Sequence, residues 1–283
     1  MIIGFIGQGF IGKHMADDCA ARGFTVVRYA LEPAYVANLE AVAGCDIVFI
    51  AVPTPTTPRG FDSSILERVL PLVGVGKIAV IKSTVLPGTT ARLQQQCTDR
   101  VVLHAPEFLR EKYAARDTAH PLRTIIGLPV MDAVHEAAAS QVLSVVPKAP
   151  YELVCQSETA ELIKYGGNCF LAQKVVFMNI LYEAARATGA DYNSVAAAMA
   201  ADPRIGSSHM NVIDESGHSG SVPGRGAGGH CFPKDLAAFA GWYDETVRTD
   251  SDGRKLWRAL EAKNNSLLRT SHKDLDLLQG IYG

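Results

Sequence analysis

The fold is decided by residues 2–12, which read IIGFIGQGFIG. The apolar run predicts a buried strand, and the turn Gly7-Gln8-Gly9-Phe10-Ile11-Gly12 follows it directly and opens a helix. Glycines here permit a tight turn and let a pyrophosphate reach the first backbone amides of the helix. The turn therefore predicts a dinucleotide site, and the alternative is a tight turn without a ligand.

A βαβ rhythm continues from this turn to about residue 150. Short apolar runs alternate with helix-like stretches, namely TVVRY at 25–29, DIVFIAV at 46–52 and IAVIKS at 78–83. Such alternation predicts a parallel sheet covered by helices on both faces. We expect an α/β protein in which residues 1–150 form a Rossmann-like, doubly wound NAD-binding domain.

The second domain, residues 151–283, is expected to be helical. Apolar residues at helical spacing predict one long helix from Ser157, which would cap it, to Thr188, with a stop near Gly189. Gly166 and the glycine after it are unfavourable inside a helix, so they indicate a tight helix crossing or a ligand. Two further helices are predicted at about 233–246 and 253–268, after a glycine-rich loop.

Composition excludes several classes of function. The 283 residues include 27 Lys and Arg against 29 Asp and Glu, a formal net charge of −2 that offers no broad field for nucleic acid or an acidic membrane. The six cysteines show no CxxC spacing, so we expect reduced thiols in the cytosol and no metal site. No apolar run approaches the ~20 residues of a membrane span.

The choice between NAD and NADP rests on residues near the end of the second strand. An acidic residue is expected there to hold the adenine ribose, and Glu32 lies near that point, while Ala30 occupies the strand end itself. Arg28 leaves NADP open, because a cation there can accept a 2′-phosphate. The interpretation favours NAD.

The most specific stretch is residues 224–235, which read GRGAGGHCFPKD. A flexible glycine loop delivers Cys231 immediately before a helix whose first turn contains proline. The positive end of that helix and the nearby Lys234 are expected to lower the pKa of the thiol and favour the nucleophilic thiolate. The alternative is a buried cysteine without a chemical role.

With this stretch on view, the chain resembles the UDP-glucose/GDP-mannose dehydrogenase family, whose signature around the catalytic cysteine is GGxCxPKD. Further segments agree in order, namely AVPTPT at 51–56, KST at 82–84, PEFLRE at 106–111, and ELIKY at 161–165 followed by Asn168. The resemblance implies a Rossmann domain followed by an all-α central domain like that of 6-phosphogluconate dehydrogenase.

The resemblance also implies roles for particular residues. Cys231 would form the covalent adduct, Lys164 and Asn168 would stabilise an oxyanion, Asp235 and Thr84 would position water, and Glu107 would serve in acid–base steps. It implies cofactor contacts at Gly7, Gly9, Phe10, Ile11, Gly12, Glu32, Val52, Pro53, Thr54, Thr84 and Lys234. The implied substrate contacts are Glu107, Phe108, Leu109, Arg110, Glu111, Lys164, Asn168 and Gly228.

These roles predict a four-electron oxidation by NAD of the C6 alcohol of a nucleotide sugar such as UDP-glucose, for polysaccharide biosynthesis. Independently of the family, Lys164 and Asn168 lie four residues apart and share a helix face, where both can point at one developing charge. The cysteine would carry a thioester that water releases as the uronic acid.

The chain departs from the family pattern in four respects. The family's C-terminal UDP-binding domain is not expected in these 283 residues, and the connection between the second and third strands is shortened to about Leu39 to Cys45. The loop from Ser207 to Arg225 looks long, and His230 replaces a commoner small or aromatic residue. The substrate is therefore a nucleotide sugar or a sugar phosphate. A homodimer is expected through the central helix, which bears Phe170, Val176, Phe177 and Tyr182.

Two other functions stay open. A β-hydroxyacid or sugar-phosphate dehydrogenase shares the two-domain layout and transfers one hydride without a covalent step. A non-catalytic NAD-binding module would retain only the dinucleotide site. The cysteine motif favours the four-electron enzyme over the first, and the set of polar site residues favours it over the second.

Overall fold

The computed structural model describes residues 1–218 and 220–283. The chain forms two compact units. The first unit contains Met1–Pro55 and Asp62–Lys164, and the second contains Thr56–Phe61 and Tyr165–Gly283. Each unit is described by itself.

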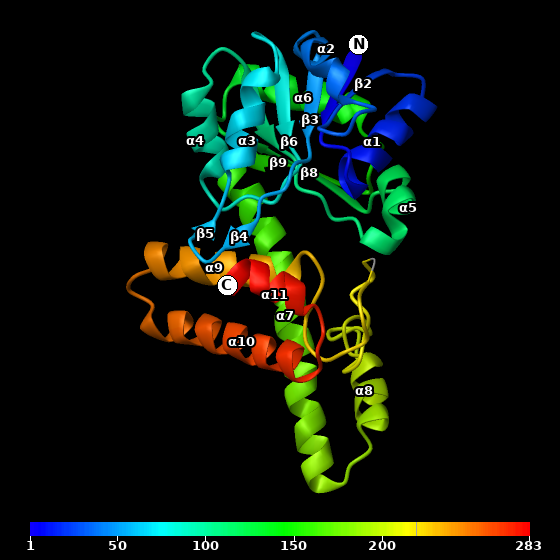
Figure 1. Cartoon of the computed structure of the whole chain (residues 1–283), viewed down its shortest axis with the longest axis vertical. Coiled ribbons are helices and arrows are strands. Elements are labelled where there is room, and N and C mark those ends of the chain that lie inside the picture. Colours follow the sequence, from blue (N-terminus) through cyan, green and yellow to red (C-terminus); the bar gives the residue numbers. More distant parts are fainter. Residues whose placement is uncertain (219) are drawn as a thin grey trace. The chain divides into compact units, whose positions relative to one another are not determined.

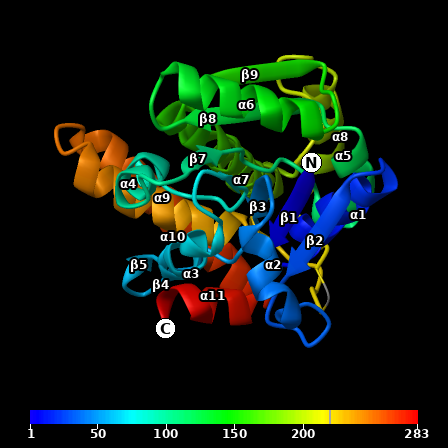
Figure 2. The same cartoon turned by 90° about the horizontal axis from the view of Figure 1, so that it is seen from above.

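A seven-stranded sheet organises the first unit, in the order β2-β1-β3-β6-β7-β8-β9. Figure 2 labels its strands except β6. Its strands are β1 (Ile2–Ile6), β2 (Thr25–Tyr29), β3 (Ile47–Ile50), β6 (Ile78–Ile81), β7 (Val101–His104), β8 (Arg123–Leu128) and β9 (Tyr151–Gln156). All neighbours pair in parallel except β7 and β8, which are antiparallel and joined at His104 and Gly127. The predicted Rossmann-like sheet is confirmed, with this one reversal.

Helices and short 3₁₀ turns connect the strands of the first unit. They are α1 (Phe10–Ala21), η1 (Val36–Asn38), α2 (Leu39–Ala43), α3 (Ser64–Val69), η2 (Leu70–Leu72), α4 (Thr89–Gln96), η3 (Glu111–Tyr113), α5 (Ala114–Ala119) and α6 (Ala133–Val145). Side chains of α1 and α6 pack against alternate residues of the strands, such as Ile3, Phe5 and Val80, to form the main core. The period-2 alternation explains why one face of each strand joins this core.

The second unit is helical, as predicted, and is built on the long helix α7 (Figure 1). Its helices are α7 (Ser157–Thr188), whose first turns belong to the first unit, α8 (Tyr192–Ala200), α9 (Phe232–Thr246), α10 (Ser251–Thr270) and α11 (Leu275–Tyr282). A small antiparallel hairpin of β4 (Thr56–Thr57) and β5 (Gly60–Phe61) belongs to this unit. The sequence predicted neither this hairpin nor α8 and α11.

Helix α7 has the predicted bounds, but the expectation that Ser157 caps it is wrong, and of the two explanations for its glycines only a ligand stays open. Gly189 ends the helix with φ 71°, and Ala190 N–H donates to Ala185 O at 2.9 Å, a left-handed stop that favours glycine. Ser157 is the first helical residue, and its hydroxyl donates to the Glu158 carboxylate rather than capping a backbone amide. A Cβ built on Gly166 would meet no heavy atom within 4 Å, so no tight crossing explains that glycine.

Helix α4 takes its N-terminal cap from a distant residue. Its N-cap, Gly88, has φ 90° and no side chain to bond the first amides. The buried Glu161 carboxylate of α7 instead accepts hydrogen bonds from Gly88 N (2.7 Å), Thr90 N (2.9 Å) and Thr90 Oγ1 (2.6 Å). Burial outweighs these bonds and raises the pKa of Glu161 to about 7.

Among the described residues, no helix combines the length and the apolar character needed to span a membrane.

Candidate active site

The glycine turn has the form that a bound pyrophosphate needs. Gly7 has φ 90°, and a Cβ there would lie 2.3 Å from Ala51 O. A Cβ on Gly12 would lie 2.0 Å from Gly7 O, whereas a Cβ on Gly9 would meet nothing within 4 Å. The fold therefore requires glycine at the first and third positions, and the second is open toward the place a ligand would take.

The amino end of α1 follows Gly9, which offers no side-chain cap, and the first turn contains no acidic residue. The amides of Phe10 and Ile11, at the positive end of the helix, are therefore suited to an anion. These residues fit the pyrophosphate of a dinucleotide.

Charges around the expected ribose position fit NAD better than NADP. Strand β2 ends at Tyr29, Ala30 is buried, and Glu32 is exposed in the turn that follows. Arg28 donates to Asp17 Oδ1 at 2.7 Å. Because this guanidinium already pairs with a carboxylate of α1, it is poorly placed to hold a 2′-phosphate.

Two loops at the carboxyl ends of β3 and β6 are tied together by hydroxyl groups. Ser83 Oγ donates to Val52 O at 2.6 Å and lies 3.1 Å from Val52 N, and Thr54 Oγ1 donates to Thr84 O at 2.7 Å. Pro53 between them is exposed. α/β proteins bind ligands at this edge of the sheet. Here its two loops are held together by hydrogen bonds that involve Val52, Thr54 and Thr84, which were predicted to contact the cofactor.

Glu107 follows β7 and is held as a carboxylate. Its Oε2 lies 3.0 Å from Lys82 Nζ, whose side chain is 8% exposed, and its Oε1 accepts from Phe108 N (2.9 Å) and Leu109 N (3.3 Å). Burial alone would raise the pKa of Glu107, but the attraction of Lys82 and these hydrogen bonds lower it. Of the two acid–base roles, the ionised group suits the base.

Lys164 contacts the same segment, residues 107–108. Its Nζ donates to Glu107 O at 2.5 Å and lies 5.5 Å from the centre of the Phe108 ring. The guanidinium carbon of Arg123 lies 3.8 Å from the same ring centre. Three cations, Lys82, Lys164 and Arg123, therefore surround residues 107–108.

Arg110 and Glu111, predicted to contact substrate, lie farther along this segment. Arg110 makes a two-pronged ion pair with Asp117, at 2.9 and 2.8 Å, and the same carboxylate accepts from Arg110 N. Glu111 begins η3 and is exposed. Because Arg110 is paired in this way, its evident effect is to fold residues 110–117.

His104, at the end of β7, was missed by the sequence analysis. It is fully buried, its Nδ1 lies 3.1 Å from Ile81 O, and its Nε2 has no hydrogen-bond partner. Burial, reinforced by the charges of Lys82 and Lys164, lowers the pKa of His104 to about 3, so the ring is neutral. A histidine inside the apolar run VVLHA is the signal that could have indicated it.

In the second unit, Cys231 is the N-cap residue of α9 and is exposed. The prediction that the cysteine directly precedes a helix is confirmed. Lys234 and Asp235 lie in the first turn, and Lys234 Nζ bonds Asp235 Oδ1 at 2.5 Å. The helix dipole favours a thiolate at this position, while part of the Lys234 charge is taken up by Asp235.

Asn168 of α7 joins the same group. Its Nδ2 donates to Asp235 Oδ2 at 2.6 Å, and the Asp235 side chain is only 1% exposed. Burial would lower the pKa of Lys234, but the charges of Asp235 and Cys231 outweigh it and raise that pKa. Within the second unit, the structure therefore brings together Asn168, Lys234 and Asp235, with the thiol electrostatically coupled to Lys234.

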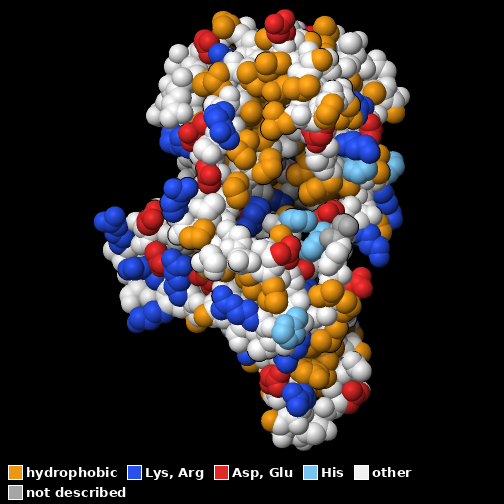
Figure 3. All heavy atoms as spheres, viewed as in Figure 1, with side chains coloured by type: hydrophobic (Ala, Val, Ile, Leu, Met, Phe, Trp, Pro, Cys, Tyr) orange, Lys and Arg blue, Asp and Glu red, His pale blue; other side chains and the backbone are white. Residues whose placement is uncertain are grey.

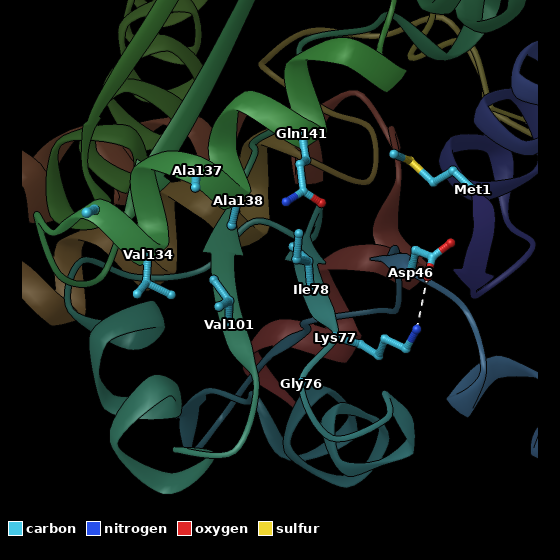
Figure 4. A pocket seen from close by; sticks show the side chains of 11 residues that line it. Met1, Asp46, Gly76, Lys77, Ile78, Val101, Val134, Ala137, Ala138 and Gln141 are labelled. Atoms are coloured by element: carbon cyan, nitrogen blue, oxygen red, sulfur yellow. Dashed lines mark hydrogen bonds and ion pairs between the residues drawn. The ribbon is translucent and has the colours of Figure 1, made fainter.

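The described residues also form an open surface pocket of about 610 Å³ in the first unit (Figure 4). It is lined by residues of β6, β7 and α6, and by Asp46 and Lys77, which form an ion pair of 2.9 Å. The pocket lies at the amino ends of β3 and β6. Because the glycine turn follows the carboxyl end of β1, this pocket is at the opposite edge of the sheet from the predicted dinucleotide site.

An α/β unit with an open dinucleotide turn, followed by a helical unit that presents a cysteine at a helix start, defines the class of two-unit NAD-binding proteins. The chain belongs to the UDP-glucose/GDP-mannose dehydrogenase family. Residues 36–144 match the NAD binding domain of that family, and residues 158–266 match its central domain. The glycine turn lies ahead of the first matched range.

Curated relatives include two bacterial enzymes. One is the UDP-glucose 6-dehydrogenase of Rhizobium meliloti, 35% identical over an alignment of 214 residues that covers 70% of this chain and 46% of the relative. Another is the UDP-glucose 6-dehydrogenase YwqF of Bacillus subtilis, 31% identical, with 86% of this chain and 54% of the relative covered. Across five of the curated relatives, the chain covers between 30% and 64% of the relative's length.

Solved structures of other proteins are similar to this chain. A UDP-glucose dehydrogenase from the archaeon Pyrobaculum islandicum superposes with a TM-score of 0.80 at 30% identity, covering 95% of this chain and 68% of that one. The 3-hydroxyisobutyrate dehydrogenase of Mycobacterium tuberculosis, at 19% identity, covers 99% and 98% of the two chains with a TM-score of 0.69. The second likeness concerns the fold alone.

Proposed function

We propose that this chain oxidises the C6 alcohol of a nucleotide sugar of the UDP-glucose type to the acid, with NAD as oxidant and a thioester on Cys231 as intermediate. The observation that carries the proposal is the exposed thiol at the start of α9, next to the Asn168–Asp235–Lys234 group. A two-electron dehydrogenase has no use for this arrangement.

The glycine turn would hold two NAD molecules in succession, and each would accept the hydride of one of the two oxidation steps. In the first unit, the Glu107 carboxylate takes the proton of the substrate alcohol, and Lys164 stabilises the developing oxygen anion. Phe108, Leu109 and Glu111 belong to the segment that binds the sugar.

In the second unit, the Cys231 thiolate adds to the aldehyde carbon, and its sulfur becomes the acyl carrier after the second oxidation. Asn168 donates to the oxyanion. Asp235, a role that Thr84 is proposed to share, positions the water that releases the acid and regenerates the thiol, and the backbone of Gly228 contacts the sugar.

The test is a count of NADH formed per substrate consumed, across UDP-sugars, GDP-sugars and sugar phosphates. Two NADH per substrate supports the thioester route and names the substrate. One NADH supports a β-hydroxyacid or sugar-phosphate dehydrogenase instead. NAD binding without turnover on the whole panel supports a binding module.

A matched pair of cysteine variants isolates the covalent step. Cys231→Ala is expected to abolish acid formation, because no other described cysteine lies at a helix start beside a lysine and an aspartate. Cys97→Ala, a change at a half-buried thiol outside this group, is expected to keep full activity. Acid formation by the first variant would overturn the mechanism.

The proposal includes a homodimer formed through α7. Phe170 is 65% exposed and Phe177 and Ile180 are each 51% exposed, at helical spacing on one stripe that also holds Gly166 and Ala184. Apolar side chains also gather on the helical unit in Figure 3. The expected role of Val176 and Tyr182 in this contact is wrong, because Val176 is buried and Tyr182 packs on Tyr192 and Arg225 within the chain.

The reaction would supply a sugar acid for polysaccharide synthesis, and the cytosol is its expected setting. The support is chemical: the mechanism needs Cys231 as a reduced thiol, and all six cysteines are free.

A further inference from the structure

The glycine loop before Cys231 is held by side chains from the end of α10. Asn264 makes two bonds to Ala227, accepting from its N–H at 2.8 Å and donating to its carbonyl at 3.0 Å. Ser271 Oγ accepts from Arg225 N at 2.9 Å, and Lys273 Nζ donates to Gly226 O at 3.2 Å. The loop backbone is thus fixed at three successive residues, 225–227.

Asp274 holds the next part of the loop, two residues before the nucleophile. Its Oδ2 accepts from Gly229 N at 2.7 Å and from Ser216 Oγ at 2.5 Å, and its Oδ1 lies 3.0 Å from His218 Nε2. The Asp274 side chain is 1% exposed, and its backbone has φ 51°. Such a conformation in a residue other than glycine persists where the surroundings fix it.

Gly228 is required by this contact. A Cβ on Gly228 would lie 2.1 Å from Asp274 Oδ2 and 2.6 Å from Ser216 Oγ. The carboxylate can approach the loop only because this residue has no side chain. Glycine is therefore required at position 228 whether or not a substrate contacts it.

The Asp274 contacts lead on to the residue beside the thiol. The rings of His218 and His230 lie 4.7 Å apart, inclined by 59°. The buried carboxylate thus orients His218, and His218 packs against His230, which immediately precedes Cys231. The long loop and His230 were the two features of this region that the family resemblance did not explain.

We propose that Asp274 is a positioning residue for the nucleophile: by holding Gly229, Ser216 and His218, it keeps Cys231 at the positive end of α9. The proposal rests on Cys231 being the reactive thiol of the proposed function. Its test measures the thiol directly and needs no turnover, so the two proposals can fail separately.

Because charged groups surround the thiol, the direction in which its pKa changes when Asp274 is replaced distinguishes loss of positioning from loss of charge. Lys234, which is paired with Asp235, interacts electrostatically with Cys231 from the same helix. His230 precedes the thiol in the loop, and Lys273 and Asp274 come from the segment after α10. Removing a carboxylate by itself would lower the pKa of a nearby thiol. Loss of the thiol from the helix end would raise it toward the ~8.5 of a free cysteine.

The experiment follows alkylation of Cys231 by iodoacetamide against pH, with the modified cysteine identified by mass spectrometry. Asp274→Ala is expected to raise the midpoint of the reaction and to slow alkylation at neutral pH about tenfold. Asp274→Asn, which keeps an oxygen for Gly229 and Ser216 and loses only the charge, is expected to have a midpoint at or slightly below the wild-type value. Asp276→Ala, at an exposed aspartate of α11, is the matched control.

A midpoint that is unchanged or lowered in Asp274→Ala would overturn the proposal, because Asp274 would then act only on stability or through its charge. If that variant does not fold, Ser216→Ala removes one of the three contacts and is expected to raise the midpoint by a smaller amount. An unchanged midpoint in a folded Ser216→Ala protein would count equally against the proposal.

Discussion

Replacing Lys82 by Met tests whether Glu107 serves as a base because a buried cation keeps it ionised. The pair is separated by 3.0 Å, and the two side chains are 8% and 19% exposed. At an effective dielectric constant of about 20, the attraction at this distance is about 5 kcal/mol as an upper bound. Solvent and the amides of Phe108 and Leu109 reduce this, and adjacent opposite charges shift carboxyl pKa values by about 1–3 units.

The direction of the change in the pKa of Glu107 follows from these charges. In the wild type the pKa of Glu107 lies below its usual 4.5, so the base form is present throughout the neutral range. Without the Lys82 charge, burial dominates and the pKa rises. We therefore expect the acidic limb of kcat/KM to move up by about 2 pH units in Lys82→Met, with activity falling about tenfold per unit below the new pKa.

The assay is kcat/KM against pH for the best substrate, with urea unfolding measured in parallel. Lys82→Arg, which keeps the charge, is expected to retain the wild-type limb. Lys77→Met removes a lysine from the more exposed ion pair with Asp46 and serves as the control. An acidic limb at the same pH in Lys82→Met and the wild type would refute the reasoning.

Three further outcomes are expected. Gly12→Ala should lower the free energy of unfolding by about 1–3 kcal/mol in urea, because its Cβ meets Gly7 O, whereas Gly9→Val should keep stability and lose NAD affinity by calorimetry. Because burial raises the pKa of Glu161 from 4.5 to about 7, stability should fall with rising pH across that interval by up to about 3 kcal/mol, and Glu161→Gln should remove this slope. Phe177→Glu should convert a dimer to a monomer in sedimentation, and a wild-type mass of one chain would contradict the dimer.

Much of the fold was predictable because its signals are local. The glycine turn, the bounds of α7 and the helix after Cys231 all follow from short stretches of sequence. Helices α8 and α11 are only 9 and 8 residues long and gave no clear periodic signal. The hairpin at 56–61 belongs to the second unit although it lies in the middle of the sequence of the first.

Single sequence motifs indicated individual site residues, but not the contacts between residues that lie far apart in the sequence. Lys82 lay in a quoted motif, but its role depends on β6 and β7 being neighbours in the sheet. The contact between His218 and Asp274 joins residues 56 apart in the sequence, with no spacing rule to indicate it. Glu107 was expected in acid–base steps, and the cation that sets its charge could be found only from the folded chain.

The amino end of α4 is capped by the carboxylate of Glu161 in α7, and this bears on the order of folding. Thr90 bonds a carboxylate 71 residues later in the chain. Nothing in its own N-cap replaces that bond, and a helix of 8 residues is marginal alone. We therefore expect α4 to form fully only after Glu161 and the start of α7 have been synthesised, because the bonds that close this long loop need both segments.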